Sequence, residues 1–227
     1  MSEPALQISD LVFTHRDTGG DDFTLTMGSL RLDPGEQALM VGGSGSGKST
    51  LLQLISGLID PDSGSVHVDG QDVHGMGGAA RDRFRGRSIG MIFQTFNLLD
   101  GFSARENVLT ALMFSDIPSG EHGARADALL GDLGIDRPDA TPDRLSVGQQ
   151  QRVAVARALA CRPGLVLADE PTASLDPDNA ENAVRLIRES CSREGAALLL
   201  TSHDPQLRTV FDRVEDIEDA SRSDRNP

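Results

Sequence analysis

The chain of 227 residues has no tryptophan, no tyrosine, two cysteines and a single lysine, Lys48. Cys161 and Cys191 lack the spacing of a zinc site and are too few for a disulfide framework, so both are predicted to be reduced residues in or near helices. No apolar run approaches the roughly 18 residues that cross a bilayer, and Met1 to Pro4 lack the features of a signal peptide. We expect a soluble protein that reaches any membrane through a partner.

The charge is strongly negative. The chain has 35 acidic residues against 21 lysines and arginines, a net charge of −14 at neutral pH. Such a surface repels nucleic-acid phosphates and anionic lipid headgroups, so we expect no nucleic-acid partner and no direct lipid insertion. Residues 79–87 hold four arginines in nine positions, and on so acidic a chain this run predicts a solvated helical face in place of a nucleic-acid patch.

The only lysine stands in the segment GGSGSGKST, an intact match to the pattern G-x-x-x-x-G-K-[ST]. In such a loop, glycines let backbone N–H groups turn toward phosphates, the ammonium reaches the β and γ phosphates, and a hydroxyl holds Mg²⁺. The planar guanidinium of arginine would not replace that compact charge. The predicted phosphate-binding residues are Gly42, Gly43, Ser44, Gly45, Ser46, Gly47, Lys48, Ser49 and Thr50, with the Ser49 hydroxyl at the metal.

The composition of this segment also suits a flexible linker, and its context decides between the two interpretations. Residues 37–41 predict a short buried strand directly before it. Apolar residues recur at helical spacing directly after it, at Leu51, Leu52, Leu54, Ile55 and Leu58. A helix that begins at Lys48 adds unpaired N–H donors and a partial positive charge to the loop, so the context favours a phosphate site.

The remaining pattern predicts an α/β fold. Alternating apolar residues predict strands at 6–13 and 23–32. Residues 89–93 predict a further strand, and short apolar runs at 165–168 and 196–201 predict strands buried in a parallel sheet. Helices predicted at 103–113 and 121–133 form an insert in the middle of the chain. In such a sheet the ligand binds at the carboxyl ends of the strands.

Asp169 and Glu170 directly follow the apolar run at 165–168. An aspartate at a strand end can hold a hydrated Mg²⁺, and a following carboxylate can orient or deprotonate an attacking water. Alone, this pattern is common where a strand reaches solvent. Together with the upstream phosphate loop it predicts the second part of a triphosphate site, with Asp169 at the metal and Glu170 as general base.

The most specific segment is LSVGQQQR at residues 145–152, which continues as VAVARAL. It resembles the signature of ATP-binding cassette proteins, LSGGQ followed by QRVAIARAL, with Val147 in place of the first glycine. An ordinary capped helix would explain Ser146 alone. As a signature, Ser146 and Gly148 would offer a hydroxyl, a bare N–H and a helix dipole to an anion.

The resemblance extends over most of the chain. Gln94 is similar to the glutamine of the Q-loop, residues 174–176 to the D-loop with Asp176, and residues 201–204 to the loop of the switch histidine, His203. It implies a P-loop NTPase (RecA-like) core with a parallel sheet, an N-terminal antiparallel β region and an inserted helical subdomain. One nucleotide-binding domain would span 1–227, with its core at about 1–94 and 160–227 and the helical signature subdomain at about 95–159.

The resemblance to the family is weaker at the last strand of the fold. Phe211 to Val214 resemble its start, but Glu215 to Asp219 are expected to be too acidic to complete it.

The resemblance implies a head-to-tail dimer with ATP and Mg²⁺ between the phosphate loop of one chain and the signature helix of the other. A second copy of this chain is the expected partner, which would supply Ser146, Gly148 and Gln149. Hydrolysis would open the dimer, with Glu170 as general base and His203 at the γ-phosphate. Gln94 would sense the γ-phosphate and the metal, and Asp176 would communicate across the interface.

The adenine contact differs from the family pattern. The position that usually carries a stacking aromatic ring aligns with His15, and the chain has no tyrosine or tryptophan to place there. An imidazole ring would stack on adenine more weakly than the ring of tyrosine or tryptophan would. Phe13 is the alternative, although its position also suits a core residue.

Residues 89–99 and 106–108 are similar to the branch that serves lipoprotein release, macrolide-type efflux and the cell-division permease. This implies a separate integral-membrane permease as partner, and a location on the cytoplasmic face of the inner membrane. The alternatives are a soluble cassette ATPase acting on ribosomes or DNA, and a degenerate cassette that binds ATP without turnover. The intact Glu170 and His203 argue against the second.

Overall fold

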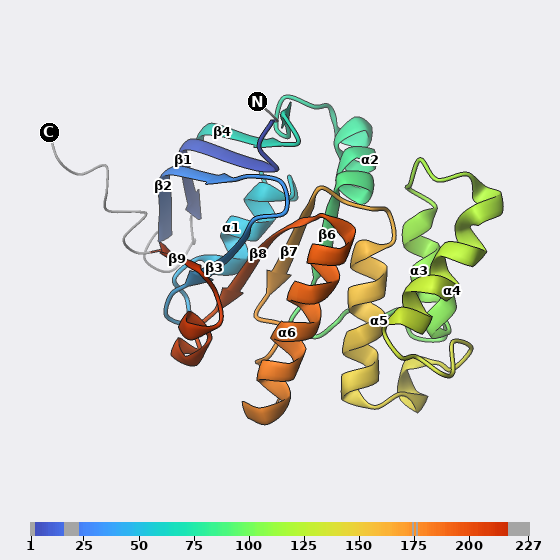
Figure 1. Ribbon diagram of the computed structural model, residues 1–227. Coiled ribbons are helices and arrows are strands. Elements are labelled where there is room, and N and C mark those ends of the chain that lie inside the picture. The colour runs from blue at the N-terminus through green and yellow to red at the C-terminus, as the bar shows by residue number, and fades with distance from the viewer. Residues whose placement is uncertain (1–2, 16–22, 174, 176, 218–227) are drawn as a thin grey trace, which may run out of the picture.

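The computed structural model describes residues 3–15, 23–173, 175 and 177–217, and within these ranges it contains two β-sheets and six α-helices (Figure 1). The first sheet is antiparallel, has the order β2-β1-β4-β5, and consists of β1 (Leu6–His15), β2 (Phe23–Leu32), β4 (Ser63–Val68) and β5 (Gln71–Asp72). The second is parallel, has the order β6-β7-β8-β3-β9, and consists of β3 (Gln37–Val41), β6 (Ile89–Ile92), β7 (Leu165–Asp169), β8 (Ala197–Ser202) and β9 (Arg213–Asp216). The predicted fold class is confirmed.

The helices are α1 (Lys48–Ile55), α2 (Gly78–Ser88), α3 (Ala104–Leu112), α4 (His122–Asp132), α5 (Val147–Leu159) and α6 (Pro177–Glu194). Short 3₁₀ turns occupy Ser119–Glu121, Pro142–Arg144 and Pro205–Thr209. Among the described residues, none of the helices combines the length and the apolar character needed to span a bilayer.

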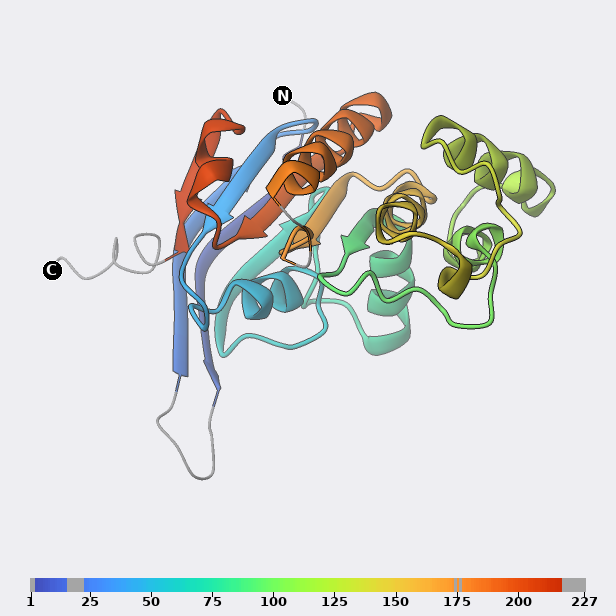
Figure 2. The ribbon, with the colours of Figure 1, turned by 90° about the horizontal axis from the view of Figure 1, so that it is seen from below.

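The parallel sheet is buried on both faces because helices cover each side. Along β3, Ala38 and Met40 belong to the core shared with α1 and the antiparallel sheet, whereas Leu39 and Val41 belong to the core shared with α5 and α6. Side chains alternate between the faces of a strand, so a continuous apolar run is what a sheet covered on both sides requires. Figure 2 shows α1 on one face and α5 and α6 on the other.

The helices α3 and α4 lie beyond α5, on the side of the molecule opposite the antiparallel sheet (Figures 1 and 2). Ser103 begins α3 with a capping box: its hydroxyl accepts from the Glu106 N–H at 3.2 Å, and the Glu106 carboxylate accepts from the Ser103 N–H at 2.7 Å. Arg105 on α3 pairs with Asp127 on α4 at 2.6 Å. The helices expected at 103–113 and 121–133 are therefore present.

Several local expectations differ from the structure. The helix α1 ends at Ile55 and not at Leu58, because Gly57 adopts a left-handed conformation (φ 68°). The strand β9 forms through Asp216 despite its acidic residues. As an edge strand it keeps its carboxylates partly solvated, and Arg213 pairs with both Glu36 and Glu215.

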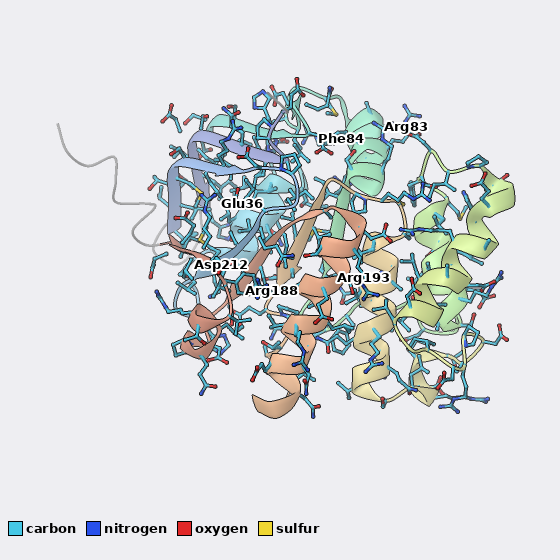
Figure 3. The ribbon with its side chains drawn as sticks, viewed as in Figure 1. Glu36, Arg83, Phe84, Arg188, Arg193 and Asp212 are labelled. Carbon is cyan, nitrogen blue, oxygen red and sulfur yellow. The ribbon has the colours of Figure 1, made fainter. Side chains whose placement is uncertain are left out.

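Of the four arginines of α2, Arg83 and Arg87 are exposed, as the sequence predicts, whereas Arg81 and Arg85 are half-buried. Arg81 pairs with Asp60 at 2.5 Å, and Arg85 donates to the backbone carbonyl of Ser56 at 3.3 Å. Figure 3 shows Arg83 directed away from the sheets and Phe84 on the opposite side of the helix, where Phe84 is buried. The helix therefore uses two of its arginines to tie itself to the turn after α1.

Both cysteines are free thiols, as the sequence predicts. Cys191 is buried in α6, and burial raises the pKa of its thiol to about 12. Cys161 follows α5, and burial raises its pKa to about 11. Both thiols therefore stay protonated and unreactive near neutral pH.

Candidate nucleotide-binding site

The phosphate loop connects α1 to the carboxyl end of β3, which lies between β8 and the edge strand β9 in the parallel sheet. Gly45 and Gly47 have positive φ angles of 77° and 94°, which L-residues with side chains rarely adopt. A Cβ atom on Gly47 would lie 2.7 Å from Cζ of Phe23, and one on Gly42 would lie 2.5 Å from Oγ of Ser46. Lack of space therefore favours glycine at both positions, and at Gly47 the left-handed backbone conformation favours it as well.

The N-terminus of α1 has hydrogen-bond donors available for an anion. Its N-cap, Gly47, has no side chain to accept from the first turn, and that turn contains no acidic residue. The Ser46 hydroxyl is buried and has no hydrogen-bond partner among the described residues. Unpaired helix-terminal N–H groups and a buried orphan hydroxyl are the donors that a phosphate group would satisfy.

Lys48 is the first residue of α1 and is only 4% exposed. Its Nζ donates to the carbonyl oxygens of Gly42 at 2.9 Å and Gly43 at 2.8 Å. It also lies 3.1 Å from Oε1 of Glu170. The ammonium is therefore held inside the loop, with a carboxylate as its counter-charge.

Glu170 and His203 meet at the ends of neighbouring strands, β7 and β8. Glu170 has a positive φ of 42°, and its N–H donates to the Thr201 carbonyl at 3.1 Å, so the backbone turns its carboxylate toward Lys48. The other carboxylate oxygen, Oε2, contacts Nδ1 of His203, which is exposed. Three of the four predicted catalytic residues, Lys48, Glu170 and His203, thus form one contiguous group, and the fourth, Gln94, is also one of the predicted metal ligands.

The predicted metal ligands Ser49 and Asp169 are also adjacent. The Ser49 hydroxyl donates to Oδ1 of Asp169 at 3.1 Å, and the Thr201 hydroxyl donates to the same atom at 3.0 Å. A hydroxyl and a carboxylate are hard oxygen donors of the kind that Mg²⁺ prefers, so the donor set fits that ion. Gln94, the third predicted ligand, is exposed and lines the same cavity as Ser49.

A cavity of about 760 Å³ joins these groups. Its walls contain eleven of the predicted site residues, namely His15, Ser44, Gly45, Ser46, Gly47, Lys48, Ser49, Thr50, Gln94, Glu170 and His203. Gly42 and Gly43 line a smaller cavity next to His203. Phe13 and Phe23 also line the main cavity; the sequence analysis did not single out Phe23, although its position directly opposite His15 in the hairpin could have indicated it.

The signature residues are not part of this cavity. Ser146 is the N-cap of α5, where its hydroxyl accepts from the Gln149 N–H at 3.3 Å and the Gln149 side chain accepts from the Ser146 N–H at 3.0 Å. Ser146 and Gly148 are exposed and line a separate cavity of about 720 Å³ between α5 and α6. The structure therefore divides the predicted nucleotide-binding residues into two groups. Asp176 lies outside the described residues.

Arg157 connects the signature helix to the segment after Gln94, and the sequence analysis assigned it no role. Its guanidinium donates to the carbonyl oxygens of Phe96 at 2.7 Å and Asn97 at 2.5 Å, two residues with positive φ angles of 60° and 47°. Burial lowers the pKa of Arg157. This side chain fixes the unusual backbone that follows Gln94 onto α5.

The comparisons with known proteins agree with this geometry. Residues 25–173 match the family described as ABC transporter. The chain is 40% identical over 215 residues to the lipoprotein-releasing system ATP-binding protein LolD of Maricaulis maris, covering 94% of each sequence. It is 42% identical over 191 residues to the macrolide export ATP-binding/permease protein MacB of Azoarcus sp., covering 84% of this chain and 29% of MacB.

A solved structure of the ATP-binding cassette MJ0796, described as a dimeric post-hydrolysis state bound to ADP and Pi, has a TM-score of 0.77 and 30% identity and covers 93% of both chains. These similarities confirm the predicted family, the predicted branch and the ATPase activity, and they favour a transporter subunit over a ribosome- or DNA-directed ATPase. The chain therefore belongs to the ABC transporter family, as an ATP-binding and ATP-hydrolysing subunit.

Proposed function

We propose that two copies of this chain bind ATP between them and that ATP binding and hydrolysis move a separate membrane permease. The observation that carries the proposal is the division of the site. Lys48, Ser49, Glu170 and the other predicted residues of the main cavity, here called the α1 group, line one cavity, whereas Ser146 and Gly148 lie exposed outside it. A second copy, turned head to tail, would bring its Ser146 to the phosphates held by the first. The related cassette MJ0796 is described as a dimer.

In this arrangement the phosphate loop binds the triphosphate first. The N–H groups of the first turn of α1 and the Lys48 ammonium neutralise the phosphates. Because Lys48 is held by Glu170 at 3.1 Å before nucleotide binds, the arriving phosphates compete for Lys48 and free the Glu170 carboxylate. Glu170 then accepts a proton from the attacking water, and His203 supports the γ-phosphate.

The metal belongs to the same proposal. Ser49, Asp169 and Gln94 would hold Mg²⁺, which when bound neutralises charge on the phosphate oxygens. The contact of Ser49 with Asp169 at 3.1 Å supports this assignment. Asp176 as the link across the dimer stays a prediction.

The permease partner is proposed from the relatives and from the surface. MacB carries ATP-binding and permease functions in one protein, of which this chain matches 29%. Of the six exposed large apolar side chains among the described residues, four fall between residues 99 and 114, at Leu99, Phe102, Met113 and Phe114. Such exposed apolar side chains suit contact with another protein. The subunit would act on the cytoplasmic face of the membrane, bound there through the permease.

The single lysine allows a direct test of the phosphate site. Protein labelled with ¹⁵N-lysine has only the Lys48 backbone amide as a labelled amide signal, and ¹⁵N-cysteine labels Cys161 and Cys191 as controls. We expect ATP to shift the Lys48 signal and to leave the Cys161 signal in place, and we expect the purified chain to release phosphate from ATP. An unshifted Lys48 signal at saturating ATP would contradict the site assignment.

A further inference from the structure

The cavity that contains the phosphate loop has one apolar wall. Phe13, Phe23 and Ile59 line it, and all three pack against the core of the antiparallel sheet. The rest of the lining is polar or glycine and comes from the phosphate loop and from side chains such as Gln94, Glu170 and His203. A ligand with a charged part and a flat apolar part fits a cavity of this composition.

Strand register places the aromatic rings on the same face. In the hairpin of β1 and β2, His15 pairs with Phe23 and Phe13 pairs with Leu25. Residues directly opposite each other, and residues two apart on one strand, point to the same side of a sheet. The tip of the Phe23 ring lies against Gly47, because a Cβ on Gly47 would be 2.7 Å from its Cζ atom. Phe23 is thus in contact with the residue next to Lys48.

His15 and Phe23 differ in how firmly they are held. His15 is exposed, whereas Phe23 is half-buried and packs against the core of the sheet. A ring that is already fixed loses less conformational entropy when a ligand stacks on it. Phenylalanine also presents a fully apolar face to a base, while an exposed imidazole is hydrated.

We propose that Phe23, and not His15, provides the ring on which the nucleotide base packs in this chain. The inference rests on the proposed function, since it concerns the base of the same nucleotide. Phe13 and Ile59 continue the apolar wall beside it. The base contact therefore comes from the second strand of the hairpin, and the cavity recognises the face of the base.

The test compares a ligand with a base to one without. ATP and inorganic triphosphate would be titrated by calorimetry into the wild type, Phe23→Leu and His15→Leu, with thermal unfolding as the check on folding. Phe23→Leu keeps an apolar side chain without a ring. We expect it to weaken ATP by about tenfold, in the range seen when a base loses a stacked ring, and to leave triphosphate binding within twofold. His15→Leu should leave both unchanged within about threefold.

A second variant reports the contact without removing it. The chain has no tryptophan, so Phe23→Trp introduces the only one. We expect its fluorescence to change with ATP and to change little with triphosphate. Phe102→Trp is the matched control, because Phe102 is exposed and does not line this cavity.

Two outcomes would overturn the proposal. A loss of ATP affinity in His15→Leu with none in Phe23→Leu would assign the base to His15. Equal binding of ATP and triphosphate to the wild type would mean that no base contact exists. Failure of the wild type to bind either ligand would instead contradict the phosphate site itself, and the proposed function with it.

Discussion

The N-termini of α1 and α5 are both expected to face phosphates, and they are built in opposite ways. At α1 the N-cap is Gly47, which has no side chain, and the neighbouring Ser46 hydroxyl is buried without a described partner. At α5 the N-cap is Ser146, which forms a complete capping box with Gln149. The first terminus opens onto the cavity that Lys48, Glu170 and His203 line, and the second is exposed outside that cavity.

This difference indicates an order of events. The α1 terminus has unsatisfied donors and a buried lysine, so it can hold a triphosphate within a single chain. The α5 terminus is already satisfied by its own side chains, so it gains less from an anion on its own. In the proposed dimer this exposed end would acquire its role when a second copy brings it to a bound nucleotide. In that dimer the N-terminus of α1 would supply affinity for the nucleotide, and the N-terminus of α5 would supply a contact across the interface.

The largest expected effect is on turnover at the α1 group. In Glu170→Gln the amide cannot accept the proton of water, so ATP hydrolysis should fall by roughly 10²- to 10⁴-fold while ATP binding remains. Phosphate release measures the first and calorimetry the second. The control is Glu121→Gln, which changes an exposed side chain at the start of α4. Turnover near the wild-type rate in Glu170→Gln would remove the general base from that position.

Lys48→Ala should reduce ATP affinity. It removes the ammonium that donates to two loop carbonyls and pairs with Glu170. Losing a hydrogen bond to a charged group costs about 1.5–3 kcal/mol, or roughly ten- to 150-fold in affinity. Calorimetry with ATP checks the value. A dissociation constant unchanged within twofold would show that Lys48 does not reach the phosphates.

Arg157→Gln should affect stability more than affinity. It would leave the carbonyls of Phe96 and Asn97 without their present donor, at a cost of about 1–3 kcal/mol in the free energy of unfolding. Denaturant unfolding measures the change. Arg83→Gln on α2 is the control, since Arg83 is exposed and should be neutral (Figure 3). If Arg157→Gln and Arg83→Gln had the same free energy of unfolding, the link between α5 and the segment after Gln94 would not be needed for folding.

Ser146→Ala should have the smallest effect on a single copy. Loss of an N-cap hydroxyl costs about 1 kcal/mol in the free energy of unfolding, and the affinity for ATP measured with dilute protein should stay within about twofold. Turnover, which in the proposed dimer requires two copies, should fall. A large loss of ATP affinity in dilute Ser146→Ala would contradict the division between the two helix ends.

The sequence predicted those helices and strands whose apolar periodicity agrees with the residues at their ends. The strands around the phosphate loop and the helix that begins at Lys48 are present because motif and apolar spacing agree, and the helix after Ser103 also has a capping box. The strand β9 was not expected to be completed, because acidic composition argues against a strand, whereas pairing with β3 and the ion pairs of Arg213 stabilise it. Tertiary contacts of this kind are not visible in the local sequence.

The candidate site shows the same limit. The residues around Lys48 lie in motifs with fixed spacing, and the structure brings Lys48, Glu170 and His203 together from three separate segments. Phe23 and Arg157 carry no motif. The contact of Phe23 with Gly47 depends on how the hairpin packs on α1, and the contact of Arg157 with Phe96 depends on two positive φ angles. The register of the predicted hairpin could have indicated Phe23, but its contact with Gly47 and the role of Arg157 required the fold.

The most direct test of the account is the mass of Glu170→Gln in solution, measured by light scattering after gel filtration with and without ATP. The account predicts a monomer without nucleotide and a dimer with ATP. It also predicts that the double variant Glu170→Gln with Ser146→Glu stays monomeric, because the added carboxylate would meet the phosphates of the partner's ATP. If Glu170→Gln binds ATP and still has the mass of one chain, the two helix ends do not meet across a nucleotide and the account is wrong.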